Sequence, residues 1–82
     1  MTDTAAILPT LTDICREVLD DPGLVLSLET RADDVEDWDS MNHITIVVEA
    51  ERRFAIKFHT AEIEELRNVG DFVRLIGSKL AR

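Results

Sequence analysis

The sequence predicts an all-α fold: a small bundle of three main helices and one short helix, with a long loop between helices 1 and 2. Apolar residues recur at three- and four-residue spacing in separate segments, which is the period of an amphipathic helix. An alternating stretch that could form a strand has no second strand to pair with. With 82 residues, 45% of them hydrophobic and 32% charged, we expect a single domain over residues 1–82 with one modest core.

The first helix is expected in the segment that ends at Leu19. Its apolar stripe consists of Ile7, Leu8, Leu11, Ile14, Cys15, Val18 and Leu19. Proline is comfortable only in the first turn of a helix, so the regular helix should start near Pro9 or just before it. The Asp-Pro-Gly sequence at 21–23 should end it. Because Cys15 lies on the stripe, we expect a small core residue there and not a reactive thiol.

Residues 24–39 show no helical period, and we expect a loop. Sixteen residues is long for a connection without secondary structure, and such loops tend to be functional or packed over a core. The apolar side chains that could pin it down are Leu24, Leu26, Leu28, Val35 and Trp38. Trp38 could either anchor the loop on the core or contact a group attached nearby, and the sequence leaves both open.

The second helix should run from about Ser40 to Phe54 or Ala55, with Asp39 as its N-cap. On a helical wheel it has two apolar arcs. The first consists of Ile46, Val47, Ala50 and Phe54, and the second of Met41, Ile44 and Val48. One arc can face the core. Either the helix is buried on most of its surface, or the second arc is exposed for a partner, which is the alternative we favour.

Two further helices complete the expected bundle. Thr60 can cap a short helix that runs through Leu66, with Ile63 and Leu66 pointing inward, and Asn68 can cap a final helix. The apolar stripe of that last helix consists of Val69, Phe72, Val73, Ile76 and Leu80. Asp71 near its start and Lys79 near its end suit the helix dipole.

The net charge of −8 is unevenly distributed. Through Ser40 there are 11 acidic and two basic side chains, and after it six acidic and seven basic ones. An acidic first half would repel phosphate, which argues against nucleic-acid binding and favours partners with a basic surface. A solvated acidic face that only aids solubility is the alternative. With no basic leader, no apolar run that could span a bilayer and a single cysteine, we expect a cytoplasmic protein. We also expect it to be a monomer.

Ser40 would lie where backbone N–H groups are unpaired and the helix dipole is positive, a favourable place for an anion such as a phosphodiester. Asp39 beside it could help to hold a divalent cation while the hydroxyl attacks a phosphate. An Asp-Ser pair is also a common helix cap with no further role. These two residues alone leave both interpretations open.

The longer pattern resembles the acyl and peptidyl carrier protein family. The resemblance rests on the stretch DSMNHITIVVEAERRF, followed by IKF, TAEIEEL and NVGDFVRLI in the family's order and spacing, and it extends from Leu8 to Leu80. The chain is most similar to stand-alone carriers that have Trp-Asp-Ser before the modified serine. The resemblance implies a carrier and not an enzyme. Ser40 would receive a 4′-phosphopantetheine arm from coenzyme A, and the arm would hold cargo as a thioester.

The same resemblance implies roles for the neighbouring residues and a set of partners. Asp39 would assist magnesium and position the arm, and Met41 would insert into an apolar contact of a partner. Other residues on or near the partner-facing side of the helix are Thr45, Val48, Glu49 and Arg52. The implied partners are a phosphopantetheinyl transferase, an acyl- or aminoacyl-loading ligase and downstream biosynthetic enzymes. No catalytic residue and no resident metal site are expected.

Two departures from the family pattern point to a specialised carrier. Asp37 replaces the glycine that many members have three residues before the serine, and Arg52 and Arg53 interrupt the usual run of acids. Enzymes with basic docking patches would meet local repulsion there, so we predict a carrier for lipid or secondary-metabolite biosynthesis with its own partners. The alternative is a small acidic helical adaptor that binds a partner protein through the second helix without a prosthetic group.

Three other signals are given structural interpretations. His43 follows Ser40 by one helical turn, but its position toward the core and the lack of an obvious oxyanion hole argue against a Ser-His catalytic pair. His59, like Trp38, is expected to be a packing residue. The acids Asp33, Asp34, Glu36, Asp37 and Asp39 lack the order of an EF-hand, so weak cation binding is the most that we expect.

Overall fold

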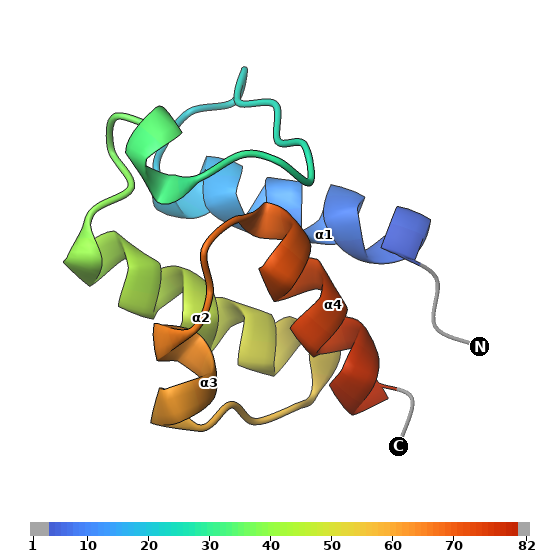
Figure 1. Cartoon of the computed structure of the whole chain (residues 1–82). Helices are drawn as coiled ribbons and strands as arrows, with labels where there is room; N and C mark the ends of the chain where they lie inside the picture. Colours follow the sequence, from blue (N-terminus) through green and yellow to red (C-terminus); the bar gives the residue numbers. More distant parts are fainter. Residues whose placement is uncertain (1–3, 81–82) are drawn as a thin grey trace.

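The structure, a computed structural model, describes residues 4–80. Its elements are α1 (Thr4–Val18), the 3₁₀ turn η1 (Ala32–Asp34), α2 (Ser40–Phe54), α3 (Thr60–Glu64) and α4 (Val69–Leu80). All regular elements within residues 4–80 are helical, which confirms the predicted all-α class with three main helices and a short one. In Figure 1 the loop between α1 and α2, cyan to green, arches over α1 before it enters α2.

α1 starts earlier than predicted, because Thr4 is already helical and Pro9 lies inside the helix. An interior proline cannot donate the backbone hydrogen bond and costs about 3 kcal/mol. The burial of Ile7, Leu11 and Ile14 along the same face offsets this cost, since each is at most 2% exposed. The apolar stripe thus decides where this helix runs, and the proline is accommodated on its exposed side.

One hydrophobic cluster joins the three main helices to the loop. Its buried members are Ile7, Leu11, Ile14, Cys15 and Leu19 around α1, Leu26 and Trp38 in the loop, Ile46, Val47 and Ala50 on α2, and Val69, Phe72, Val73 and Ile76 on α4. Cys15 is a core side chain as predicted, and its burial raises the pKa of the thiol to about 12. Leu28 and Leu80 were also expected to pack inward, but both are exposed, Leu80 in the last turn of α4.

The long loop is tied to α4 through its backbone. The carbonyl oxygens of Thr30 and Leu28 accept hydrogen bonds from the N–H groups of Val69 and Gly70, both at 2.8 Å. These N–H groups belong to the first turn of α4 and would otherwise lack partners. A Cβ atom on Gly70 would lie 2.9 Å from the Leu28 oxygen, so this contact requires glycine. The loop therefore acts as a cap for α4.

The boundaries of α2 are those predicted. The Asp39 side chain accepts a hydrogen bond from the Asn42 N–H at 2.8 Å, which is the expected N-cap. At the other end Ala55 has a left-handed conformation (φ 55°), and its N–H donates to the Glu51 carbonyl. Two local capping interactions thus define the helix that begins at Ser40.

The short helix α3 differs from the prediction. Thr60 is its first helical residue and not its cap, and the helix ends at Glu64 instead of Leu66. His59 precedes it and is exposed, so the packing role expected for this histidine is wrong; its backbone N–H donates to the Glu62 carboxylate at 2.8 Å. A five-residue helix offers too few periodic positions for its ends to be read from the sequence.

The last helix confirms its predicted cap, because Asn68 Oδ1 accepts a hydrogen bond from the Asp71 N–H at 2.8 Å. Partly buried Ile63 and Leu66, from the region of α3, pack against the core as expected. No helix within residues 4–80 has the length and apolar character needed to cross a membrane.

Candidate functional site

Ser40 is the first residue of α2, and its side chain is exposed at the point where the long loop enters the helix. Asp39 before it is also exposed, and its carboxylate is held by the Asn42 N–H. On the other side of the cap, the Asn42 side-chain amide donates to the Asp37 carbonyl at 2.8 Å. The serine hydroxyl is therefore accessible while the backbone around it is fixed.

Trp38 anchors the loop to the core, which was one of the two roles considered for it. Its side chain is 8% exposed, and its indole N–H donates to His43 Nδ1 at 3.1 Å. The His43 ring also approaches Phe72 of α4, with ring centroids 6.4 Å apart. Burial lowers the pKa of His43. The imidazole is thus a neutral acceptor for tryptophan on the core side of α2, and the structure gives it the packing role that was predicted.

The second apolar arc of α2 is exposed. Met41, Ile44 and Val48 are 79%, 64% and 46% exposed, whereas the first arc is buried at Ile46, Val47 and Ala50 and partly buried at Phe54. Thr45 is also exposed on α2, where its hydroxyl donates to the Met41 carbonyl. Of the two alternatives for this helix, exposure on one side is confirmed. Ile44 was noted as a member of the arc but was not included among the candidate partner-binding residues.

The two arginines of α2 have different surroundings. Arg52 has a side chain that is 75% exposed, and it pairs with Glu49 at 2.9 Å on the same helix. Arg53 instead pairs with Glu17 of α1 at 2.7 Å. Arg53 therefore links two helices, whereas Arg52, with the more exposed side chain (75% against 40%), pairs within α2. A pairing between residues so distant in sequence leaves no local pattern by which it could be predicted.

The acidic loop does not form a metal site in the part of the chain that the structure describes. No group of three or more His, Cys, Asp or Glu side chains among residues 4–80 is placed to hold an ion. Two of the acids have structural partners instead: Asp34 accepts a hydrogen bond from the Arg31 N–H, and Asp39 from the Asn42 N–H.

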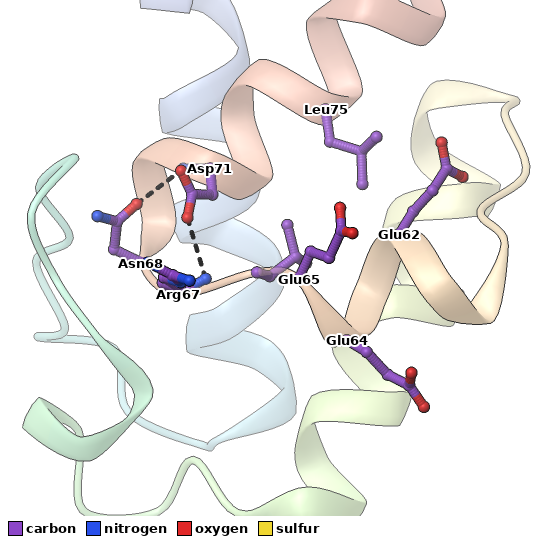
Figure 2. Close-up of a pocket in the computed structure, with 8 residues that line it drawn as sticks. Glu62, Glu64, Glu65, Arg67, Asn68, Asp71 and Leu75 are labelled. Atoms are coloured by element: carbon purple, nitrogen blue, oxygen red, sulfur yellow. Dashed lines mark hydrogen bonds between the residues drawn. The ribbon is translucent and has the colours of Figure 1, made fainter.

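A broad surface hollow of about 890 Å³ lies between α3 and α4, and no sequence motif indicated it. Figure 2 shows Glu62, Glu64 and Glu65 on one side of it and Asp71 and Leu75 of α4 on the other. Hydrogen bonds from the His59 N–H and the Lys79 ammonium lower the pKa of Glu62. The Arg67 N–H and the Arg74 guanidinium do the same for Asp71. These carboxylates thus act as local structural acceptors.

Comparison with known proteins supports the carrier interpretation. The family described as "Phosphopantetheine attachment site" matches residues 9–76. The acyl carrier protein of Renibacterium salmoninarum is 33% identical over 81 residues, which cover 99% of this chain and the whole of that protein. The chain belongs to the acyl carrier protein family. It is a carrier and not an enzyme, and the cofactor is covalently bound 4′-phosphopantetheine.

Two further acyl carrier proteins are similar to this one. That of Kineococcus radiotolerans is 40% identical over 52 residues, 63% of each chain. The solution structure of holo acyl carrier protein from Geobacter metallireducens superimposes with a TM-score of 0.87 and 45% sequence identity, covering 93% of this chain and 87% of that one. The four-helix arrangement of this acyl carrier protein is therefore that of a solved member of the family.

The residues at the start of α2 fit a covalently attached phosphate. The Ser40 hydroxyl is exposed, and it lies at a helix N-terminus, where the dipole favours a phosphodiester anion. Asp39 is a carboxylate that a magnesium ion can approach. The core side chains Trp38 and His43 hold the loop and the helix on either side of the serine, without blocking it.

Proposed function

We propose that this acyl carrier protein carries its phosphopantetheine on Ser40. The exposed hydroxyl at the capped start of α2 is the observation that supports this assignment. In the loading step, Ser40 Oγ forms a bond to the pantetheine-bearing phosphorus of coenzyme A, and adenosine bisphosphate leaves. The serine proton passes to a base of the transferase. The attached arm supplies a thiol that holds cargo as a thioester.

Asp39 has two roles in this proposal. Its carboxylate caps α2 through the Asn42 N–H, so its position relative to Ser40 is fixed by the helix itself. Because the same carboxylate is exposed, it can assist the magnesium ion that a phosphopantetheinyl transferase brings to the site.

The attachment site is tested by incubating the purified protein with coenzyme A, magnesium and a broad-specificity phosphopantetheinyl transferase. Intact mass spectrometry should show the addition of one phosphopantetheine group to the wild-type protein and none to Ser40→Ala. Ser78→Ala is the matched control, since Ser78 is another exposed helical serine, and it should be modified like the wild type. A folded wild-type protein that stays bare would instead favour the adaptor function.

We also propose that the exposed side of α2 is the surface that meets partner enzymes. Met41 and Val48 offer apolar contacts, and Thr45, Glu49 and Arg52 lie beside them. Charged groups at the rim of such a surface mainly affect the rate of encounter and the choice of partner. The transferase, a loading ligase for acyl or aminoacyl groups and the downstream enzymes would share this surface in turn.

The pathway we propose is a specialised one in lipid or secondary-metabolite biosynthesis, served by a monomeric carrier in the cytoplasm. The motivation is Arg52, which places an exposed cation beside Glu49 where the family pattern has acids. A general fatty-acid synthase should load and elongate on this carrier more slowly than on its own carrier, when both are supplied in the holo form. Equal rates on the two carriers would remove the basis for a specialised pathway.

A further inference from the structure

A small cavity, partly open to solvent, lies beside the first turn of α2, close in the chain to Ser40. Its volume is about 40 Å³, and it is lined by residues of the long loop, α2, α4 and the turn before α4, among them Trp38, His43, Leu66 and Phe72. By the space that one buried water needs, it holds on the order of three water molecules. An alkyl chain of several carbons does not fit without displacement of a side chain.

Three of the side chains that line the cavity, Trp38, His43 and Phe72, are held by several contacts. The indole N–H of Trp38 donates to His43 Nδ1 at 3.1 Å, and the two rings lie 6.1 Å apart. The His43 ring also approaches the Phe72 ring, and the rings of Phe72 and Phe58 form a T-shaped pair with centroids 5.7 Å apart. Aromatic contacts therefore run from the loop through the centre of the bundle, and opening the cavity would disturb more than one of them.

If an alkyl chain of the cargo displaced the Trp38 indole from the core, the net gain in free energy would be small. A buried aromatic side chain removes a large apolar area from water, so an alkyl chain that displaced the indole would expose about as much apolar surface as it covered. It would also leave His43 Nδ1 without its donor at a half-buried position, which carries its own cost.

We propose that Trp38 and His43 close the core beside Ser40, so that this carrier holds its cargo outside the helical bundle and is suited to short or polar acyl or aminoacyl groups. This inference rests on the proposed attachment at Ser40. A long alkyl chain would stay in contact with water on such a carrier, whereas a short or polar group has no need of a hydrophobic cavity.

The test compares the holo protein with its octanoyl form, after intact mass spectrometry has confirmed each species. Trp38 is the only tryptophan of the chain, so its fluorescence and its indole N–H resonance report on the closure directly. Octanoylation should leave the emission maximum, the indole shift, the Phe72 amide shift and the thermal midpoint unchanged. A displaced indole, or a higher midpoint for the octanoyl form, would overturn the inference.

Trp38→Ala is the complementary variant. Removal of the indole should enlarge the cavity, so octanoylation should then raise the thermal midpoint and shift the Phe72 amide. If it does neither, Trp38 is not what excludes the chain. Should this variant fail to fold, Trp38→Phe, which keeps a ring but lacks the donor, takes its place with a smaller effect in the same direction. A failure of the proposed attachment would be recognised earlier, as the absence of the holo mass.

Discussion

At the scale of single residues, the contact between Trp38 and His43 has the clearest consequences. The pair joins the loop before Ser40 to the helix after it through one hydrogen bond between side chains. The acceptor is an imidazole nitrogen, and a protonated imidazole would present a donor to the indole donor instead. The anchoring of the loop therefore depends on the protonation state of one ring.

We predict that acidification weakens the fold through His43. Burial lowers the pKa of this residue below its ordinary value of 6.5, so folding favours the neutral ring. The resulting stability is present above about pH 6.5 and is lost as the pH falls through the lower pKa of the folded state. Denaturant unfolding of the wild type between about pH 7.5 and 5 should show this loss.

His43→Gln is the control for this prediction, because glutamine keeps an acceptor for the indole but does not titrate in this range. Its stability should vary less with pH than that of the wild type. Glu62 and Asp71 have lowered pKa values, so their contributions to stability are lost only at more acidic pH. Parallel pH profiles of the variant and the wild type would contradict the role of His43.

At the scale of elements, the junction between the loop and α4 depends on Gly70. We predict that Gly70→Ala lowers the free energy of unfolding by about 1–3 kcal/mol, the usual effect of overpacking. The added Cβ would lie 2.9 Å from the Leu28 oxygen, which already accepts the Gly70 N–H, so the loop must shift. This outweighs the higher helix propensity of alanine. Denaturant unfolding monitored by circular dichroism measures the change.

Gly23→Ala provides the matched control for that substitution. A Cβ at Gly23 would meet its nearest neighbour, Asp21 Oδ1, at 3.8 Å, an ordinary contact, and no glycine of the described chain has a positive φ. The stability of this variant should be unchanged or slightly higher, by up to about 1 kcal/mol. Equal losses for both variants would indicate a general effect of removing glycine and not the close approach at α4.

The elements also show what the sequence could predict. The start of α2 near Ser40 was predicted because its cap is local, with Asp39 three residues before the amide that it binds. The predicted start of α1 was wrong because the preference of proline for the first turn of a helix is a local effect. The apolar stripe of α1 overrides this preference, since tertiary packing stabilises it. The capping of α4 by loop carbonyls has no signal in the sequence, since it depends on two segments that lie about 40 residues apart.

At the scale of the whole molecule, the charge asymmetry of the sequence appears as a difference in charge between the two ends of α2. The loop before Ser40 is acidic, and the far end of α2 carries Arg52 and Arg53. Both arginines form an ion pair, Arg52 with Glu49 and Arg53 with Glu17, but the side chain of Arg52 is the more exposed of the two, at 75% against 40%. A partner complementary to this surface would be basic near the attachment site and acidic, or neutral, near the end of α2.

We predict that Arg52→Glu increases the kcat/KM for acyl transfer to the holo carrier by an acyltransferase of a general fatty-acid synthase with a basic docking patch. Reversal of one exposed charge should change the rate roughly two- to fivefold at low salt, the size expected for an exposed ion pair. The gain should fall as salt screens the interaction. Lys57→Glu makes the same change in net charge at an exposed site beyond α2 and should have less effect. If kcat/KM increases equally for both variants, the net charge of the carrier governs the encounter and the local surface of α2 does not. The proposal of a specialised docking surface would then lose its support.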